Sequence, residues 1–180
     1  MDINNISYNT VLSHVFPGVI LEMQMFLAAS LFSPVDINAK AMAFVQANFS
    51  MLVSFGVLFF VVATILGFIL DGIHHFIFHK FERTTFDIYK YLTTLERMEI
   101  AGSVLDDDLW YPYEAYANIW IAMMPGFILF PYWMHIHHFH YLFIIISMCV
   151  YLAVFIIMFI EAVRTIQWYK EVEREIIKAF

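Results

Sequence analysis

The stretch YLFIIISMCVYLAVFIIMFI, residues 141–160, contains no charged residue and decides the fold class of this chain. A helix needs about 20 predominantly apolar residues to cross the hydrocarbon core of a bilayer. Residues 49–70 form a second uncharged stretch of this kind, and residues 11–32 form a third that contains one charge, Glu22. Residues 116–134 are shorter, uncharged and interrupted by prolines. We therefore predict an all-α, polytopic membrane protein with four transmembrane helices.

The composition supports a membrane protein and excludes several other classes. Hydrophobic residues make up 62% of the chain and charged residues only 14%, whereas soluble domains carry about 25% charged residues. The formal net charge of −7 excludes a globally basic nucleic-acid binder. The single cysteine, Cys149, excludes an internal disulfide and a cysteine-based zinc site. No Lys or Arg precedes Lys40, so we expect no cleaved signal peptide.

The distribution of Lys and Arg predicts the orientation of the chain in the membrane. With four spans, both termini and the middle loop share one side, and eight of the nine Lys and Arg residues fall there. Cytoplasmic loops carry such an excess, so we predict an N-in/C-in, multi-pass protein of the cell inner membrane. The expected parts are a first transmembrane pair (1–81), a cytoplasmic helical insert (82–115), a second transmembrane pair (116–160) and a cytoplasmic C-terminal helix (161–180).

The C-terminal segment 161–180 carries an apolar stripe at helical spacing. The stripe consists of Ile166, Tyr169, Val172, Ile176 and Phe180. An exposed apolar stripe on a helix needs a packing partner. We expect this partner to be either the insert or the same helix of another subunit.

Polar and small residues lie inside the first span. His14, Gly18 and Glu22 are four residues apart and share one helix face, and a carboxylate within a span usually faces a bundle interior or water. We expect these three residues to line a pore, with helix kinks at Pro17 and Pro125. Two alternatives stay open. In the first alternative, Glu22 is a structural acid that forms hydrogen bonds to polar residues of the second span. In the second alternative, Pro17 starts the helix and Glu22 lies nearer the cytoplasmic edge.

Seven histidines form two clusters in the sequence, and clustered histidines are a signal for metal ligation. The first cluster is His74, His75 and His79, and the second is His135, His137, His138 and His140. The pattern looks somewhat like the histidine boxes of membrane hydroxylases. The predicted topology separates the clusters by the hydrocarbon core, about 30 Å, so we expect no shared di-iron centre. Zinc binding or pH sensing by either cluster alone stays open beside a purely interfacial role, and metal binding is considered chiefly at the second cluster.

No P-loop, dinucleotide-binding glycine motif or nucleophile elbow occurs in the sequence. The chain also has no segment long enough for a separate soluble catalytic domain. We therefore expect no bound cofactor and a protein that is not an enzyme.

The layout resembles the small four-helix membrane effectors of bacterial anti-phage defence systems, of the Hailong or Kiwa type. The resemblance lies in the early Phe16-Pro17-Gly18 of the first span, the helical insert and the helical C-terminal tail. It implies a homo-oligomeric channel, with a tetramer favoured, that is gated at its cytoplasmic face by a nucleotide or oligonucleotide signal or by a partner protein. The cations available for such a ligand or gate are Lys80, Arg83, Lys90, Arg97, Arg164, Lys170 and Arg174.

These observations lead to one expected function and two rivals. We expect a homo-oligomeric membrane ion channel or pore-forming effector, because four helices alone leave little room for a channel within one subunit. The first rival is a membrane metalloenzyme, hydroxylase-like, that uses the histidine clusters. The second rival is a non-catalytic membrane anchor or sensor for a soluble partner protein.

Overall fold

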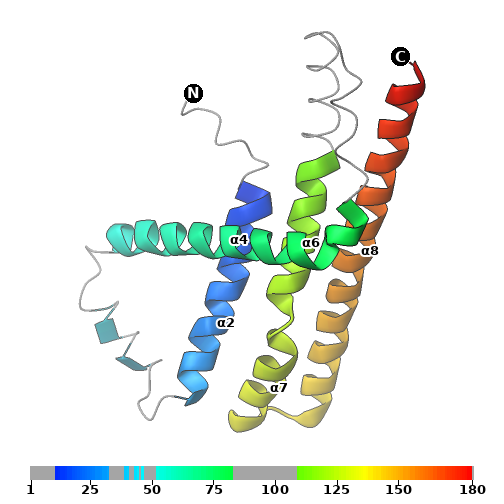
Figure 1. Cartoon of the computed structure of the whole chain (residues 1–180). Coiled ribbons are helices and arrows are strands. Elements are labelled where there is room, and N and C mark those ends of the chain that lie inside the picture. Colours follow the sequence, from blue (N-terminus) through cyan, green and yellow to red (C-terminus); the bar gives the residue numbers. More distant parts are fainter. Residues whose placement is uncertain are drawn as a thin grey trace.

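The computed structural model describes residues 11–32, 39–40, 43–44, 46, 52–82 and 109–179, and it confirms the all-α fold (Figure 1). The described residues are 95% helical and include no strand. The elements are the π-helical turn η2 (Val11–Val15), α2 (Phe16–Phe32), α4 (Leu52–Glu82), α6 (Tyr111–Met123), α7 (Gly126–Ile136) and α8 (Tyr141–Ala179).

The described part of three of the four apolar stretches is continuously helical, whereas residues 116–134 are divided between the two helices α6 and α7. Three helical segments are long and apolar enough to cross a membrane, namely Val11–Phe32, Gly56–Phe78 and Tyr141–Ile176. α6 and α7 pass the same test together as a pair bent by 44°, which gives four candidate spans if the pair counts as one. This agrees with a membrane protein. The N-in/C-in topology and the inner membrane stay predictions, and most of the expected insert, residues 83–108, lies outside the described residues.

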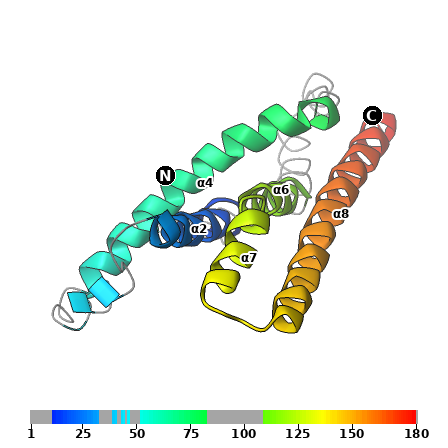
Figure 2. The ribbon, with the colours of Figure 1, turned by 90° about the horizontal axis from the view of Figure 1, so that it is seen from below.

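α4 lies across the other long helices, which run side by side (Figures 1 and 2). The sequence did not predict this crosswise direction. The crossing of α4 over η2 and α2 depends on two glycines. A Cβ atom on Gly18 would overlap the backbone of Ala63, and one on Gly67 would overlap the backbone of His14. The two backbones therefore meet directly where η2 and α2 cross α4, as small residues allow in membrane proteins.

α6 occupies the middle of the fold and contacts η2, α2, α4 and α8. Its residues 113–115, 117–118 and 121–123 are all buried. After α6 the helix is interrupted by a turn at Met124 and Pro125, and α7 begins at the next residue. Tyr151 of α8 donates a hydrogen bond of 2.6 Å to the carbonyl oxygen of Met123 at this break. The hydroxyl thereby satisfies one of the carbonyl groups that the helix end leaves without a helical partner.

The C-terminal part of α8 packs against α6 and the end of α4. Ile166 and Tyr169 are buried in one cluster with Phe78, Leu109 and Tyr113. Val172 and Ile176 pack against the same cluster. The apolar stripe predicted from the sequence therefore packs within the same chain, mainly against residues 109–117. Most of these residues belong to the predicted insert. Phe180 lies outside the described residues.

Candidate metal centre

A cluster of histidine and carboxylate side chains lies where η2, α4 and α6 meet. We call it the Asp71 cluster, and it consists of His14, Asp71, His74, His75 and Glu114. Asp71, His74 and His75 come from α4. They lie close together because residues three and four apart on an α-helix share a face. His74 Nδ1 lies 3.2 Å from Asp71 Oδ1, and His75 Nε2 lies 3.6 Å from Asp71 Oδ2.

His14 reaches Asp71 from the neighbouring element, η2. Its Nε2 atom lies 3.9 Å from Asp71 Oδ2, and its Nδ1 atom lies 2.6 Å from the hydroxyl oxygen of Ser13. The backbone of His14 rests directly on Gly67, one turn before Asp71 on α4. The close helix crossing thus fixes the distance between the imidazole and the carboxylate.

Glu114 and Asn118 approach the cluster from α6, four residues apart on one helix face. Glu114 is 6% exposed, and its Oε1 atom accepts a hydrogen bond of 2.5 Å from the indole nitrogen of Trp110. The amide nitrogen of Asn118 donates to the Ser13 carbonyl at 2.9 Å and to Asp71 Oδ1 at 3.4 Å. The other amide atom, Asn118 Oδ1, is buried and has no hydrogen-bond partner among the described residues.

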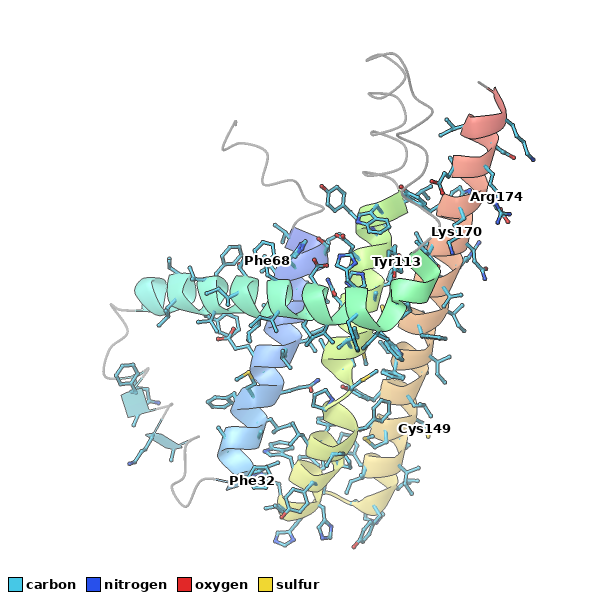
Figure 3. All side chains as sticks on the ribbon, in the orientation of Figure 1. Phe32, Phe68, Tyr113, Cys149, Lys170 and Arg174 are labelled. Carbon is cyan, nitrogen blue, oxygen red and sulfur yellow. The ribbon has the colours of Figure 1, made fainter. Side chains whose placement is uncertain are left out.

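Aromatic rings surround the cluster and limit the access of water. The ring of His74, which is fully buried, meets the ring of Tyr113 edge-on at a centroid distance of 5.5 Å. His75 stacks on Trp110 at 6.2 Å, and His14 contacts Phe68 at 4.6 Å. Figure 3 shows Phe68 on α4 and Tyr113 on α6, on either side of the region where α4 crosses. His14, His74 and Glu114 are therefore buried among apolar rings, whereas the side chains of Asp71 and His75 stay 21% and 39% exposed.

Two of the three histidine distances around Asp71 would also suit donor atoms that share a metal ion, whereas the distance of 3.2 Å to His74 is that of a hydrogen bond. Two donors that are each about 2.1 Å from an ion lie about 3.0–4.2 Å apart. The distances of 3.6 Å and 3.9 Å from Asp71 to His75 and His14 fall in this range but exceed an ordinary hydrogen bond of about 2.7–3.2 Å. No Lys or Arg of the described residues pairs with Asp71 or Glu114. A bound cation would supply the positive charge that two neighbouring carboxylates need at such a site.

The structure separates the three residues expected to line a pore. His14 belongs to the Asp71 cluster, Gly18 lies in the contact with α4, and Glu22 lies further along α2 with Oε2 buried. Pro17 is the second residue of α2, directly after the π-helical turn. Pro125 lies at the break between α6 and α7.

The second histidine cluster begins in the last turn of α7 and continues into the connection to α8, at the opposite end of the α6–α7 segment from α4 (Figure 1). Its four histidines are exposed and are His135, His137, His138 and His140. They do not enter either group of three metal-ligating atoms found among the described residues. The Nδ1 atom of His140 instead accepts a hydrogen bond from the Leu142 amide at the start of α8.

The cations expected to bind a cytoplasmic ligand do not meet in one described site. Arg164 forms an ion pair of 3.7 Å with Glu161 and lines a cavity of about 380 Å³ between α6 and α8, together with Tyr116 and Trp168. Lys170 and Arg174 lie on the C-terminal part of α8 (Figure 3). Lys80 lies near the end of α4. Arg83, Lys90 and Arg97 lie outside the described residues.

Sequence reasoning found the histidines of this centre but missed its carboxylates. Asp71 lies one residue beyond the predicted second span, and Glu114 lies outside the predicted third span. The usable signal was the helical spacing of Asp71, His74 and His75, with a second pair four residues apart at Glu114 and Asn118.

A scan against protein-family models, a search of curated proteins and a search of solved structures each found no match.

Proposed function

We propose that this chain is a metal-dependent membrane enzyme whose catalytic centre is the Asp71 cluster. The observation that supports it is the convergence on Asp71 of His14 from η2, of His74 and His75 from α4, and, as a second carboxylate, of Glu114 from α6. Metal-ligating side chains from elements distant in sequence meet because three helices cross there. Histidines with a purely interfacial role would not need to lie next to carboxylates from other helices.

The types of ligand favour a catalytic metal over a structural one. Structural zinc sites are mostly closed sets of cysteine and histidine, whereas catalytic sites combine histidine with carboxylate and keep a position open. Imidazole and carboxylate donors suit zinc, iron and manganese. A divalent ion supplies Lewis acidity, which polarises an oxygen atom of a substrate or activates a water molecule. Trp110 orients Glu114 as an outer-shell partner does in such centres.

Metal analysis of the purified protein tests the proposal. The full chain, purified in detergent and loaded with Zn²⁺, Mn²⁺ or Fe²⁺, should retain at least one ion per chain after passage through a desalting column. Asp71→Asn should lose this ion, because the substitution removes the carboxylate charge that the histidines share. Glu171→Gln is the control, since Glu171 is an exposed carboxylate on the C-terminal part of α8 and belongs to neither histidine cluster. Wild-type protein that retains no ion would contradict the proposal.

The channel predicted from the sequence is the second candidate, and one observation favours it. The Oε2 atom of Glu22 is buried inside a candidate span without a hydrogen-bond partner among the described residues. An unsatisfied carboxylate in a span marks an ion path more often than a structural contact. Glu22→Gln should then change the conductance of the protein in liposomes, while Glu171→Gln on the exposed tail should not. Equal conductance in both variants would remove the pore-lining role.

The channel also needs several subunits, so its oligomeric state is the first check. A closed ring of four or more subunits, by the mass of the purified protein without its detergent, would support a shared pore. A monomer would leave the metal centre as the functional site. A role in anti-phage defence and a nucleotide, oligonucleotide or protein ligand at the cytoplasmic face stay predictions from the resemblance.

A further inference from the structure

The cavity of about 380 Å³ between α6 and α8 is a site apart from the Asp71 cluster, since none of the described residues that line it belongs to that cluster. The α8 side chains in its lining are three or four residues apart and therefore lie on one helix face. They are Glu161, Arg164, Thr165 and Trp168. Leu109 and Tyr116 line the cavity on the side of α6. Ligand sites in proteins commonly have volumes of about 300–1,000 Å³, so the cavity is large enough for a small polar group.

The level of this cavity along α8 corresponds to the headgroup region of a bilayer. The uncharged residues 141–160 form the first part of α8, and a helix of that length is about 30 Å long, which matches the hydrocarbon core. Glu161 is the first charged residue after this stretch, and Arg164 and Trp168 follow within two turns. Tryptophan and tyrosine are enriched at the headgroup level of membrane proteins, as Trp168 and Tyr116 would be here. A membrane spanned by residues 141–160 would therefore present its headgroups to the cavity.

The lining carries one positive and one negative charge, and both are accessible. Arg164 Nη1 lies 3.7 Å from Glu161 Oε1, and the two side chains are 75% and 36% exposed. Leu109 and Thr165 are buried, whereas Trp168 is exposed, so the cavity opens to the surface of the described fold. An exposed ion pair adds little stability, so a ligand with both charges can pair with both side chains at small cost. We propose that the cavity binds the headgroup of a zwitterionic phospholipid, with its phosphate on Arg164 and its ammonium group on Glu161.

The charges and the neighbouring apolar surface favour this ligand over an anionic lipid and over a free headgroup in water. The planar guanidinium of Arg164 suits a phosphate group. An anionic lipid would leave Glu161 without a positive partner and would place a second negative charge near it. Ile157 and Ile160 are exposed on α8 one turn before Glu161 and Arg164, so the acyl chains of a bound lipid can lie along them. A free phosphoethanolamine would not gain this apolar contact.

Native mass spectrometry of the full chain in detergent tests the inference, with short-chain phosphatidylethanolamine and phosphatidylglycerol as the probes. The wild-type protein should bind a single phosphatidylethanolamine about tenfold more tightly than phosphatidylglycerol, the factor that one charged contact provides. Glu161→Gln should abolish this preference, because the partner of the ammonium group is lost. Arg164→Gln should weaken the binding of both lipids. Glu171→Gln and Arg174→Gln are the matched controls, since both residues are exposed on α8 and are not among the described residues that line the cavity, and they should leave both affinities unchanged.

Two results would overturn the inference, namely equal affinity of the wild-type protein for the two lipids and a preference that persists in Glu161→Gln. Free phosphoethanolamine at the concentration of the lipid should not displace it. Displacement would show that the ligand comes from water and that the lipid is the wrong assignment. If a variant fails to fold, the two affinities of the wild-type protein still decide the question. The result does not depend on the proposed metal centre, because the two sites share no described residue.

Discussion

The backbone carbonyl oxygen of Ala63 lies where a Cβ atom of Gly18 would stand. α2 and α4 therefore touch backbone to backbone, and the same crossing presses Gly67 of α4 against the backbone of His14. This contact brings η2 to the helix that carries Asp71. The geometry of the candidate metal centre thus depends on two glycines that take no part in its chemistry.

Replacement of Gly18 by alanine should destabilise the fold and weaken the metal centre together. The added Cβ overlaps backbone atoms, which cannot rotate away, so α2 must shift from α4. Overpacking of this kind costs about 1–3 kcal/mol and sometimes more. The free energy of unfolding in detergent and the metal content measure both effects. Gly56→Ala is the control, since no atom lies within 4 Å of a Cβ there, and an equal loss in both variants would contradict the crossing.

Replacement of Trp110 by phenylalanine should weaken metal binding without loss of the fold. The substitution keeps an aromatic ring beside Tyr113 and Tyr169 but removes the indole donor to Glu114. Loss of an outer-shell partner typically lowers metal affinity about 10–100-fold. Titration of the metal-free protein with Zn²⁺ measures the change. Trp168→Phe on the exposed face of α8 should leave the affinity unchanged, and an unchanged affinity in Trp110→Phe would argue against Glu114 as a ligand.

Acidification should release the metal reversibly. Imidazole binds a metal ion only in its neutral form and carboxylate only when ionised, so protons compete with the ion at every ligand of the Asp71 cluster. We expect high occupancy near pH 7.5 and progressive loss as the pH falls. Metal content after equilibration at each pH measures the loss. Return to pH 7.5 with added metal should restore occupancy, whereas irreversible loss would point to unfolding instead of competition.

Removal of the Tyr151 hydroxyl should lower the free energy of unfolding by weakening the contact of α8 with the turn between α6 and α7. Tyr151→Phe deletes the donor to the Met123 carbonyl and the acceptor for the Gln24 amide. Hydrogen bonds between transmembrane helices contribute about 0.6 kcal/mol on average and up to about 1.7 kcal/mol. Reversible unfolding in mixed detergent measures the difference. Tyr141→Phe, at an exposed ring, should change stability by much less, and equal effects would mean that the hydroxyl does not hold the break.

The pattern of apolar residues along the chain predicts which segments are helices and which of them are apolar enough for a membrane. Residues 141–160 illustrate this, because an uncharged stretch of that length allows little other than a helix in a bilayer. The periodicity of the tail also predicted its buried face, which Ile166 and Tyr169 confirm. Such features depend on residues close in sequence, so a pattern along the chain reports them.

The meeting of His14, Asp71 and Glu114 follows from the packing of the helices and not from any pattern along the chain. Helical periodicity indicates which face of a helix is buried, but it carries no information on the angle at which two helices cross or on the order of neighbours. The crosswise direction of α4 follows from the close contact of Gly18, Ala63 and Gly67 with residues far away in the sequence. Because that contact joins three separate elements at one point, the Asp71 cluster forms only once the helices have packed.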